Sequence, residues 1–250
     1  MEQDEDVEEE GVSSEASEKQ QAILRGISRF RAAEEEVPGA WQAKRELASS
    51  VRLLLDCICA TDATEEDLRG SANEIRAMAE RFADRPVMTD PPGIAEMALS
   101  GMETFHDRSP LVGQSNPLAP PLYLSPDPDT GRVGGTGFFG HAYEGAPGCV
   151  HGGFIAAAFD ELLGMACIFS GNPGMTGTLE IRYVSPTPVR AELRFEGSFD
   201  RCEGRKIYTT GSVFAGEVLC ATAKGLFISI TGEKFKSLNE ARRERLGSDG

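Results

Sequence analysis

One segment of this 250-residue chain, from Gly152 to Phe169, constrains the fold most, because it is apolar on nearly every side of a helix. A helix of that kind is buried either in a protein core or in a membrane. Asp160 and Glu161 stand at the centre of the segment, and two adjacent carboxylates make a bilayer span costly. The sequence therefore predicts a core helix that other elements surround, and it predicts no membrane span.

Strand patterns lie on both sides of this helix. Leu122–Leu124 and Arg132–Phe139 flank the turn-forming stretch Asp127–Gly131, which is typical of a β-hairpin. Three or four longer strands are predicted within 178–230, where apolar residues alternate over 179–183, 189–195 and 207–213. Neighbouring strands joined by such short turns must be antiparallel. The expected fold class is α+β, with a curved antiparallel sheet wrapped around the buried helix.

Two amphipathic helices are expected before the strands. Apolar residues follow a helical spacing from about Trp41 to Ala60 and again from Leu68 to Phe82. Thr64 stands three residues before Asp67, which resembles a capping box with Asp in place of Glu. The two helices would form a hairpin whose apolar face packs on the main domain.

The composition divides the chain into five predicted regions. They are an acidic, disordered tail (1–35), the helical hairpin (36–85), a linker rich in Pro and Gly with a short helix near 94–99 (86–121), the main domain (122–235) and a C-terminal tail (236–250). Nine carboxylates and no Lys or Arg lie within residues 1–18, so the formal net charge of −15 leaves −6 for the other 232 residues. Such a chain is a poor match for nucleic acid or an anionic membrane surface.

Cysteine and histidine usage points to a reduced compartment without a metal site. Six cysteines are too few for a disulfide scaffold, and the N-terminus has no basic and apolar secretory signal. Neither the cysteines nor the three histidines show metal-ligand spacing. We therefore expect a cytoplasmic protein with no bound metal.

The start of the core helix carries the candidate chemistry. Gly152 and Gly153 would place unbonded N–H groups at the positive end of the helix dipole, which is the geometry of an oxyanion hole. Asp160 lies a little over two turns further on, where burial would raise the pKa of its carboxyl towards that of a general base. His151 is expected either to cap the helix or to act in catalysis. The alternative for Asp160, and the expectation for Glu161, is a solvent-facing or salt-bridged carboxylate.

The run His151-Gly152-Gly153, with Asp160 nine residues after the histidine, resembles the signature of hotdog-fold acyl-CoA thioesterases of the PaaI-like subgroup. The similarity extends over roughly 138–230. Further matching positions are Gly148, Met175, Thr176, Tyr183, Pro186, Pro188 and the block Glu203-Gly204-Arg205-Lys206. Some relatives carry Asn six residues before the histidine, where this chain has Gly145.

This resemblance implies a hotdog fold in a homodimer or a dimer of dimers, with each active site at an interface between protomers. The Gly152 N–H would polarise the thioester carbonyl while Asp160 acts as general base or nucleophile. Thr176, from the facing protomer, would position the water or the carboxylate. Coenzyme A would be part of the substrate, so no separate cofactor is expected. Its contacts would come from Gly153 and from four basic residues, Arg182, Arg201, Arg205 and Lys206.

The predicted function is therefore hydrolysis of an acyl-CoA thioester to a free carboxylic acid and coenzyme A. Two alternatives use the same pocket: a hotdog hydratase or dehydratase that acts on acyl thioesters, and a non-catalytic acyl-CoA sensor. A third is an interaction module whose partner binds the acidic tail.

Overall fold

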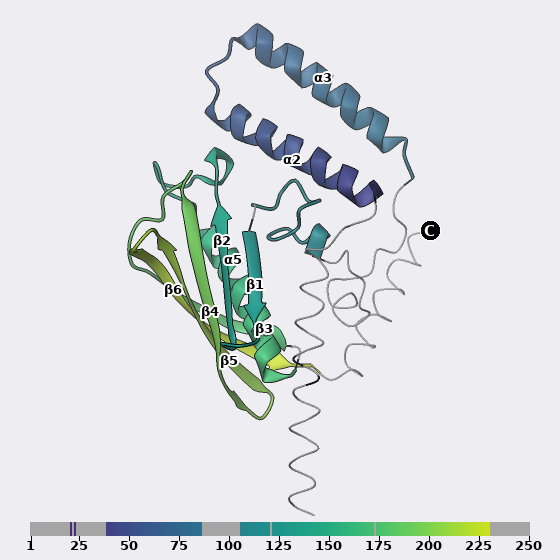
Figure 1. The fold of residues 1–250 in the computed structure, drawn as a ribbon. Helices are drawn as coiled ribbons and strands as arrows, with labels where there is room; N and C mark the ends of the chain where they lie inside the picture. The colour runs from purple at the N-terminus through teal and green to yellow at the C-terminus, as the bar shows by residue number, and fades with distance from the viewer. Residues whose placement is uncertain are drawn as a thin grey trace, which may run out of the picture.

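A computed structural model describes residues 21, 23, 39–86, 106–120, 122–172 and 174–230. The predicted tails, and the short helix predicted near 94–99, lie wholly or mostly outside these residues. The described chain forms a sheet that curves around one helix, with two further helices above it (Figure 1).

The sheet has six antiparallel strands in the order β1-β2-β4-β5-β6-β3, which leaves β1 and β3 at its edges. The strands are β1 (Leu122–Asp127), β2 (Arg132–Phe138), β3 (Gly174–Tyr183), β4 (Glu192–Glu203), β5 (Lys206–Ala215) and β6 (Val218–Ser229). The predicted hairpin around 127–131 is confirmed, and Asp127 pairs with Arg132 across its turn. The predicted antiparallel arrangement is confirmed as well.

The strand predicted from residue 189 begins later, at Glu192. Arg190 has a left-handed φ of 57°, which interrupts an extended conformation. The Val189 N–H donates to the carbonyl of Gly148, and the Arg190 N–H donates to that of Phe139. These residues therefore form a turn beside the loop that precedes the central helix.

That central helix, α5 (Gly152–Ala166), lies in the curve of the sheet and continues into the short 3-10 helix η3 (Cys167–Ser170). Phe159, Leu162 and Leu163 are fully buried against the inner face of the sheet. Gly197 and Gly211 let the helix approach closely, because a Cβ atom on either would lie about 3 Å from Leu162. The segment 152–170 is long and apolar enough to cross a membrane, but half of it is buried inside this domain, as a core helix would be.

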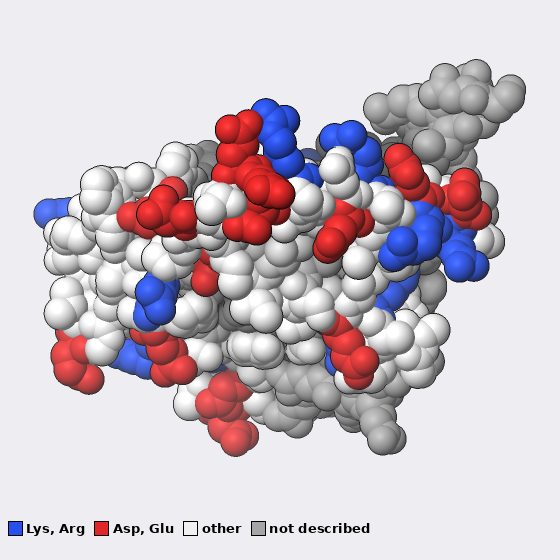
Figure 2. All heavy atoms as spheres, turned by 90° about the horizontal axis from the view of Figure 1, so that it is seen from above, with Lys and Arg blue, Asp and Glu red and all other residues white. Residues whose placement is uncertain are grey.

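The two predicted N-terminal helices are present as α2 (Gly39–Ala60) and α3 (Glu65–Ala83). The Thr64 cap is confirmed, since its hydroxyl oxygen accepts a hydrogen bond from the Asp67 N–H at 3.2 Å. Antiparallel α2 and α3 lie above the sheet in Figure 1. Figure 2, a view onto this end of the molecule, shows acidic and basic side chains interspersed and no continuous basic patch.

The expected packing of the hairpin is only partly right. The α2 helix is anchored mainly by polar contacts: Arg45 forms a bidentate ion pair with Asp107, and Arg52 donates to two backbone carbonyls of the segment 106–120. Near the other end of α2, Asp56 accepts a hydrogen bond from the His141 N–H in the 3-10 helix η2 (His141–Tyr143). No residue of α3 is buried. Most apolar positions of the two helices are exposed, and the described contacts of α2 with the main domain are mainly polar.

Candidate functional site

The N-terminus of α5 is held by His151. Its Nδ1 atom accepts a hydrogen bond from the Gly153 N–H at 3.0 Å, which confirms the capping role predicted for this histidine. Among the residues that the structure describes, the Gly152 N–H has no acceptor. A free N–H at the positive end of a helix dipole is suited to bind a carbonyl oxygen on which negative charge develops.

The loop before the helix explains the glycine at position 145. A Cβ atom on Gly145 would lie 2.8 Å from the Cα of His151, so a side chain there would displace the histidine. The His151 N–H donates to the carbonyl of Tyr143, and the Gly145 N–H donates to that of Cys149. The loop therefore presents backbone, and no side chain, at position 145.

Asp160 is paired with Thr176, the residue that the resemblance linked to it. The Thr176 hydroxyl donates to Asp160 Oδ1 at 2.6 Å, and both side chains are exposed at the β3 edge of the sheet. A β-bulge between Thr176 and Thr178 allows this contact. In a regular strand, side chains alternate between the two faces, so Gly177 and not Thr176 would share the face of Leu179 that is turned towards α5. Two expectations are thereby corrected: Thr176 belongs to the same chain as Asp160, and Asp160 is not a buried carboxylate.

The Gly152 N–H and the Asp160 carboxylate are separated along the helix. Eight residues at the α-helical rise correspond to about 12 Å along the axis. A general base and an oxyanion donor that act on one carbonyl must each come within about 3 Å of the reacting atoms or of a water between them. One chain therefore presents two half-sites, which do not converge on a single bond.

Glu161, expected in solvent, is instead largely covered. Its Oε1 accepts a hydrogen bond at 3.0 Å from the hydroxyl of Ser109, which is buried. Burial raises the pKa of Glu161 and the adjacent Asp160 carboxylate adds to the rise, while the Ser109 hydrogen bond lowers it. The reason for the difference is the segment 106–120, which packs on this side of α5.

The four basic residues predicted to bind coenzyme A do not gather around Asp160. Arg182 directly follows Ile181, and Lys206 directly precedes Ile207. Both isoleucines face inward, so alternation along the strands puts Arg182 and Lys206 on the opposite face of the sheet. Arg201 is engaged with Asp200 and Glu203 and stacks on the Tyr208 ring, 3.9 Å from its centroid. Arg205, in the β4–β5 turn, donates to the carbonyl of Ser229. A role for these residues stays a prediction.

Two residues at the site, Tyr183 and Ser109, have contacts that were not predicted from the sequence. Tyr183 ends β3 and its hydroxyl donates to the carbonyl of Gly152 at 2.7 Å. The alternation of Leu179, Ile181 and Tyr183 could have indicated that this tyrosine faces the helix. No local pattern marks Ser109, because its partner lies 52 residues away.

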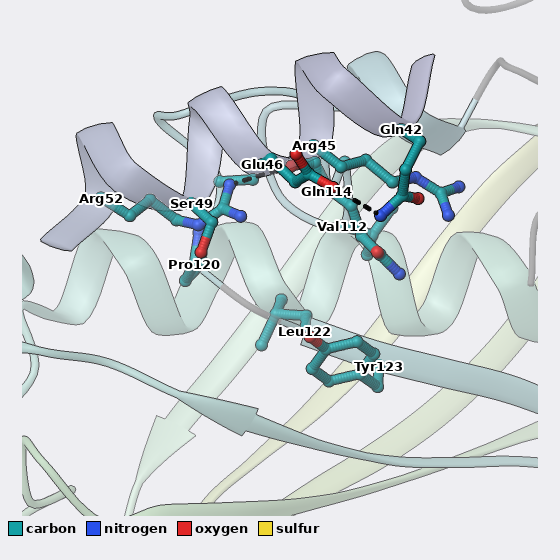
Figure 3. A pocket seen from close by; sticks show the side chains of 12 residues that line it. Gln42, Arg45, Glu46, Ser49, Arg52, Val112, Gln114, Pro120, Leu122 and Tyr123 are labelled. Carbon is teal, nitrogen blue, oxygen red and sulfur yellow. Dashed lines mark hydrogen bonds between the residues drawn. The ribbon is translucent and has the colours of Figure 1, made fainter. Parts of the chain in front are cut away.

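A pocket of about 250 Å³ lies elsewhere, between α2 and the start of β1 (Figure 3). None of the predicted site residues lines it. Its two arginines, Arg45 and Arg52, are the ones that hold α2 to Asp107 and to the carbonyls of Gln114 and Asn116. In the described part of the chain, no group of three His, Cys, Asp or Glu side chains could hold a metal ion.

The comparisons with known proteins lead to thioesterases. Residues 147–221 match the model of the thioesterase superfamily. Acyl-coenzyme A thioesterase THEM4 of Rattus norvegicus is 34% identical over 93 residues, which are 36% of this chain and 40% of that protein. Acyl-coenzyme A thioesterase THEM5 of Homo sapiens is 28% identical over 97 residues, 38% of this chain and 39% of that protein. The match thus spans about two fifths of the length of these curated relatives.

A solved structure extends the similarity beyond the sheet. A crystal structure described as a thioesterase superfamily protein is 31% identical, with a TM-score of 0.67. The alignment covers 77% of this chain and 97% of that one, which is more than the sheet and α5 alone can account for. The sheet around a central helix is the hotdog fold, and the chain belongs to the thioesterase superfamily.

Proposed function

We propose that this protein hydrolyses an acyl-CoA thioester to a free carboxylic acid and coenzyme A. The observation that carries the proposal is the hydrogen bond between Thr176 of β3 and Asp160 of α5, a helix whose first N–H, that of Gly152, has no acceptor among the described residues. The curated relatives named acyl-coenzyme A thioesterases support coenzyme A as the leaving group.

In the proposed reaction, Asp160 accepts a proton from a water molecule as the water oxygen attacks the thioester carbonyl carbon. The Gly152 N–H stabilises the negative charge that develops on the carbonyl oxygen. The tetrahedral intermediate then collapses, the C–S bond breaks, and the coenzyme A thiolate takes the proton that Asp160 accepted, which returns Asp160 to its carboxylate form. Because Thr176 binds Oδ1, the other carboxylate oxygen of Asp160 is left for the water. Direct attack by Asp160, followed by hydrolysis of the resulting anhydride, gives the same products.

The separation of about 12 Å within one α5 helix supports a site shared by two protomers. In the proposed homodimer, the Gly152 N–H of one protomer meets the Asp160–Thr176 pair of its partner. The β3 edge, which has no neighbouring strand in the described chain, is the proposed pairing surface. Exposed apolar side chains at its two ends, Met175 and Tyr183, are consistent with burial in such an interface.

The test is thiol release from short, medium, long and aryl acyl-CoAs by the wild type and by Asp160→Asn. We expect kcat to fall by about 10²-fold or more, because a general base contributes on that order, with KM and thermal stability little changed. Asp129→Asn is the matched control, since Asp129 is also exposed but lies in the β1–β2 turn.

Other outcomes would identify the alternatives. Tight acyl-CoA binding without thiol release by the wild type would indicate a sensor. Consumption of an enoyl thioester without thiol release would indicate a hydratase. Full activity of Asp160→Asn would contradict the mechanism.

A further inference from the structure

The end of β3 brings a tyrosine against the helix start. Tyr183 follows Leu179 and Ile181 on the side of the strand that faces α5, and these two side chains pack on the core. Its hydroxyl donates to the Gly152 carbonyl at 2.7 Å, although 31 residues separate the two in sequence. Its ring lies so close that a Cβ atom on Gly152 would be 3.2 Å from the hydroxyl oxygen and 3.3 Å from Cζ.

The peptide unit after Gly152 is thereby held at both ends. Its carbonyl accepts from Tyr183, and its N–H, which belongs to Gly153, donates to His151 Nδ1 at 3.0 Å. A peptide unit is planar, so two fixed groups on opposite sides of the bond fix the plane. The Gly152 N–H belongs to the preceding peptide unit, whose His151 carbonyl accepts a hydrogen bond from the Phe154 N–H at 2.9 Å. The two peptide units meet at the Cα of Gly152, and because glycine has the widest choice of φ and ψ, holding the second unit limits how the first can turn.

We propose that Tyr183 is a positioning residue for the oxyanion donor: its phenol holds the peptide unit that follows Gly152, and together with the hydrogen bond of the His151 carbonyl in the preceding unit it restricts the direction of the Gly152 N–H. Tyr183 does not touch the reacting atoms in this role. The inference rests on the proposed function, because the direction of that N–H matters only if a carbonyl oxygen binds to it. It also assigns a reason for glycine at position 152, since the Tyr183 ring occupies the space next to it.

The test compares the wild type with Tyr183→Phe, which removes only the hydroxyl. We expect kcat on the best acyl-CoA of the panel to fall about tenfold, less than the 10²- to 10³-fold loss of a whole oxyanion donor. KM should stay within about twofold, because the donor acts mainly in the transition state. The affinity for a thioether analogue of the same acyl-CoA, which cannot be hydrolysed, should be unchanged.

The matched control is Tyr123→Phe on the other edge strand. Tyr123 is 57% exposed against 54% for Tyr183, and its hydroxyl has no hydrogen-bond partner within the described residues. We expect this variant to keep both kcat and KM.

Each result bears on one of the two proposals. If the wild type hydrolyses thioesters and Tyr183→Phe keeps its kcat, the positioning role is wrong and the proposed function stands. A loss of activity that only follows the loss of folded protein, or a rise in KM at unchanged kcat, also overturns the positioning role. If the wild type hydrolyses no thioester, the proposed function fails and this inference fails with it.

Discussion

Asp160 and Glu161 are neighbours in sequence, and each accepts a hydrogen bond from a hydroxyl, but Asp160 is exposed and Glu161 is largely covered. Successive residues of a helix point about 100° apart, so Asp160 reaches the exposed edge of β3 while Glu161 faces the segment 106–120. Burial, the larger effect, raises the pKa of Glu161. A carboxyl whose pKa is higher in the folded state than in the unfolded state contributes stability at low pH, and this contribution is lost as the pH rises through the folded-state pKa.

The substitution Glu161→Gln tests the direction in which Glu161 makes the stability of the protein depend on pH. The amide oxygen still accepts from Ser109, but the group no longer ionises. Below the ordinary Glu pKa of 4.5, the variant and the wild type should be nearly equal in stability. As the pH rises towards neutrality, the variant should become more stable relative to the wild type, as measured by urea unfolding at a series of pH values. Glu180→Gln, on the exposed β3 strand, should show no such divergence. If the free energies of unfolding of Glu161→Gln and the wild type change with pH in parallel, the prediction is refuted.

At the scale of elements, α3 is unusual because it is a helix of 19 residues with no buried side chain. Most helices in proteins gain their stability from the packing of an apolar face, which α3 does not bury, so local interactions weigh more in how well α3 is formed. The described ones are the Thr64 cap, the hydrogen bond of its hydroxyl to the Asp67 carboxylate, and the exposed Arg69–Glu65 ion pair. The cap is the strongest of these, since exposed ion pairs contribute little.

Thr64→Ala should therefore loosen α3 without disturbing the sheet. Loss of an N-cap costs about 1 kcal/mol, which corresponds to roughly fivefold faster amide hydrogen exchange in a helix that opens locally. Ser71→Ala changes the middle of the same helix and should leave its exchange unchanged or slower, because alanine favours helix. Equal exchange in Thr64→Ala and the wild type would show that other contacts hold α3.

Some contacts of these helices and strands could be predicted from the sequence, and others could not. Both helix caps were predictable because each connects residues within three positions of one another, at Thr64 and at His151. The contacts of the site were not. Thr176–Asp160, Tyr183–Gly152 and Ser109–Glu161 span 16, 31 and 52 residues and depend on a bulge, a strand register and the path of a segment. The resemblance supplied Thr176 but not the fact that it binds Asp160 of its own chain, since a motif carries residue types and not chain membership.

At the scale of the whole molecule, the proposed site depends on which chain supplies the Gly152 N–H and which supplies the Asp160 carboxylate. Gly152→Pro removes the N–H donor at the first helical position, where proline is tolerated. Gly152→Ala keeps the N–H and is the control for crowding against Tyr183. Alone, Gly152→Pro and Asp160→Asn should each be inactive.

A mixed dimer of these two inactive chains distinguishes the arrangements. If each site takes its donor from one protomer and its base from the other, the heterodimer has one intact site and should show about half of wild-type activity. If each site belongs to one chain, the heterodimer has no intact site and should show none. Two affinity tags allow the heterodimer to be purified before thiol release is measured.

The close approach of α5 to the sheet at Gly197 and Gly211 also has a consequence for how this protein can evolve. A methyl group at Gly211 would lie 3.0 Å from the carbonyl oxygen of Glu196 and as close to Leu162 and Leu163, so even alanine would press on the helix. The same helix carries both Gly152 and Asp160. Selection for the proposed activity would therefore also act on these two glycines, although neither belongs to the proposed site. Larger residues at these two positions of the sheet would displace α5, so we expect the rest of the sheet to vary in sequence more freely than these two glycines.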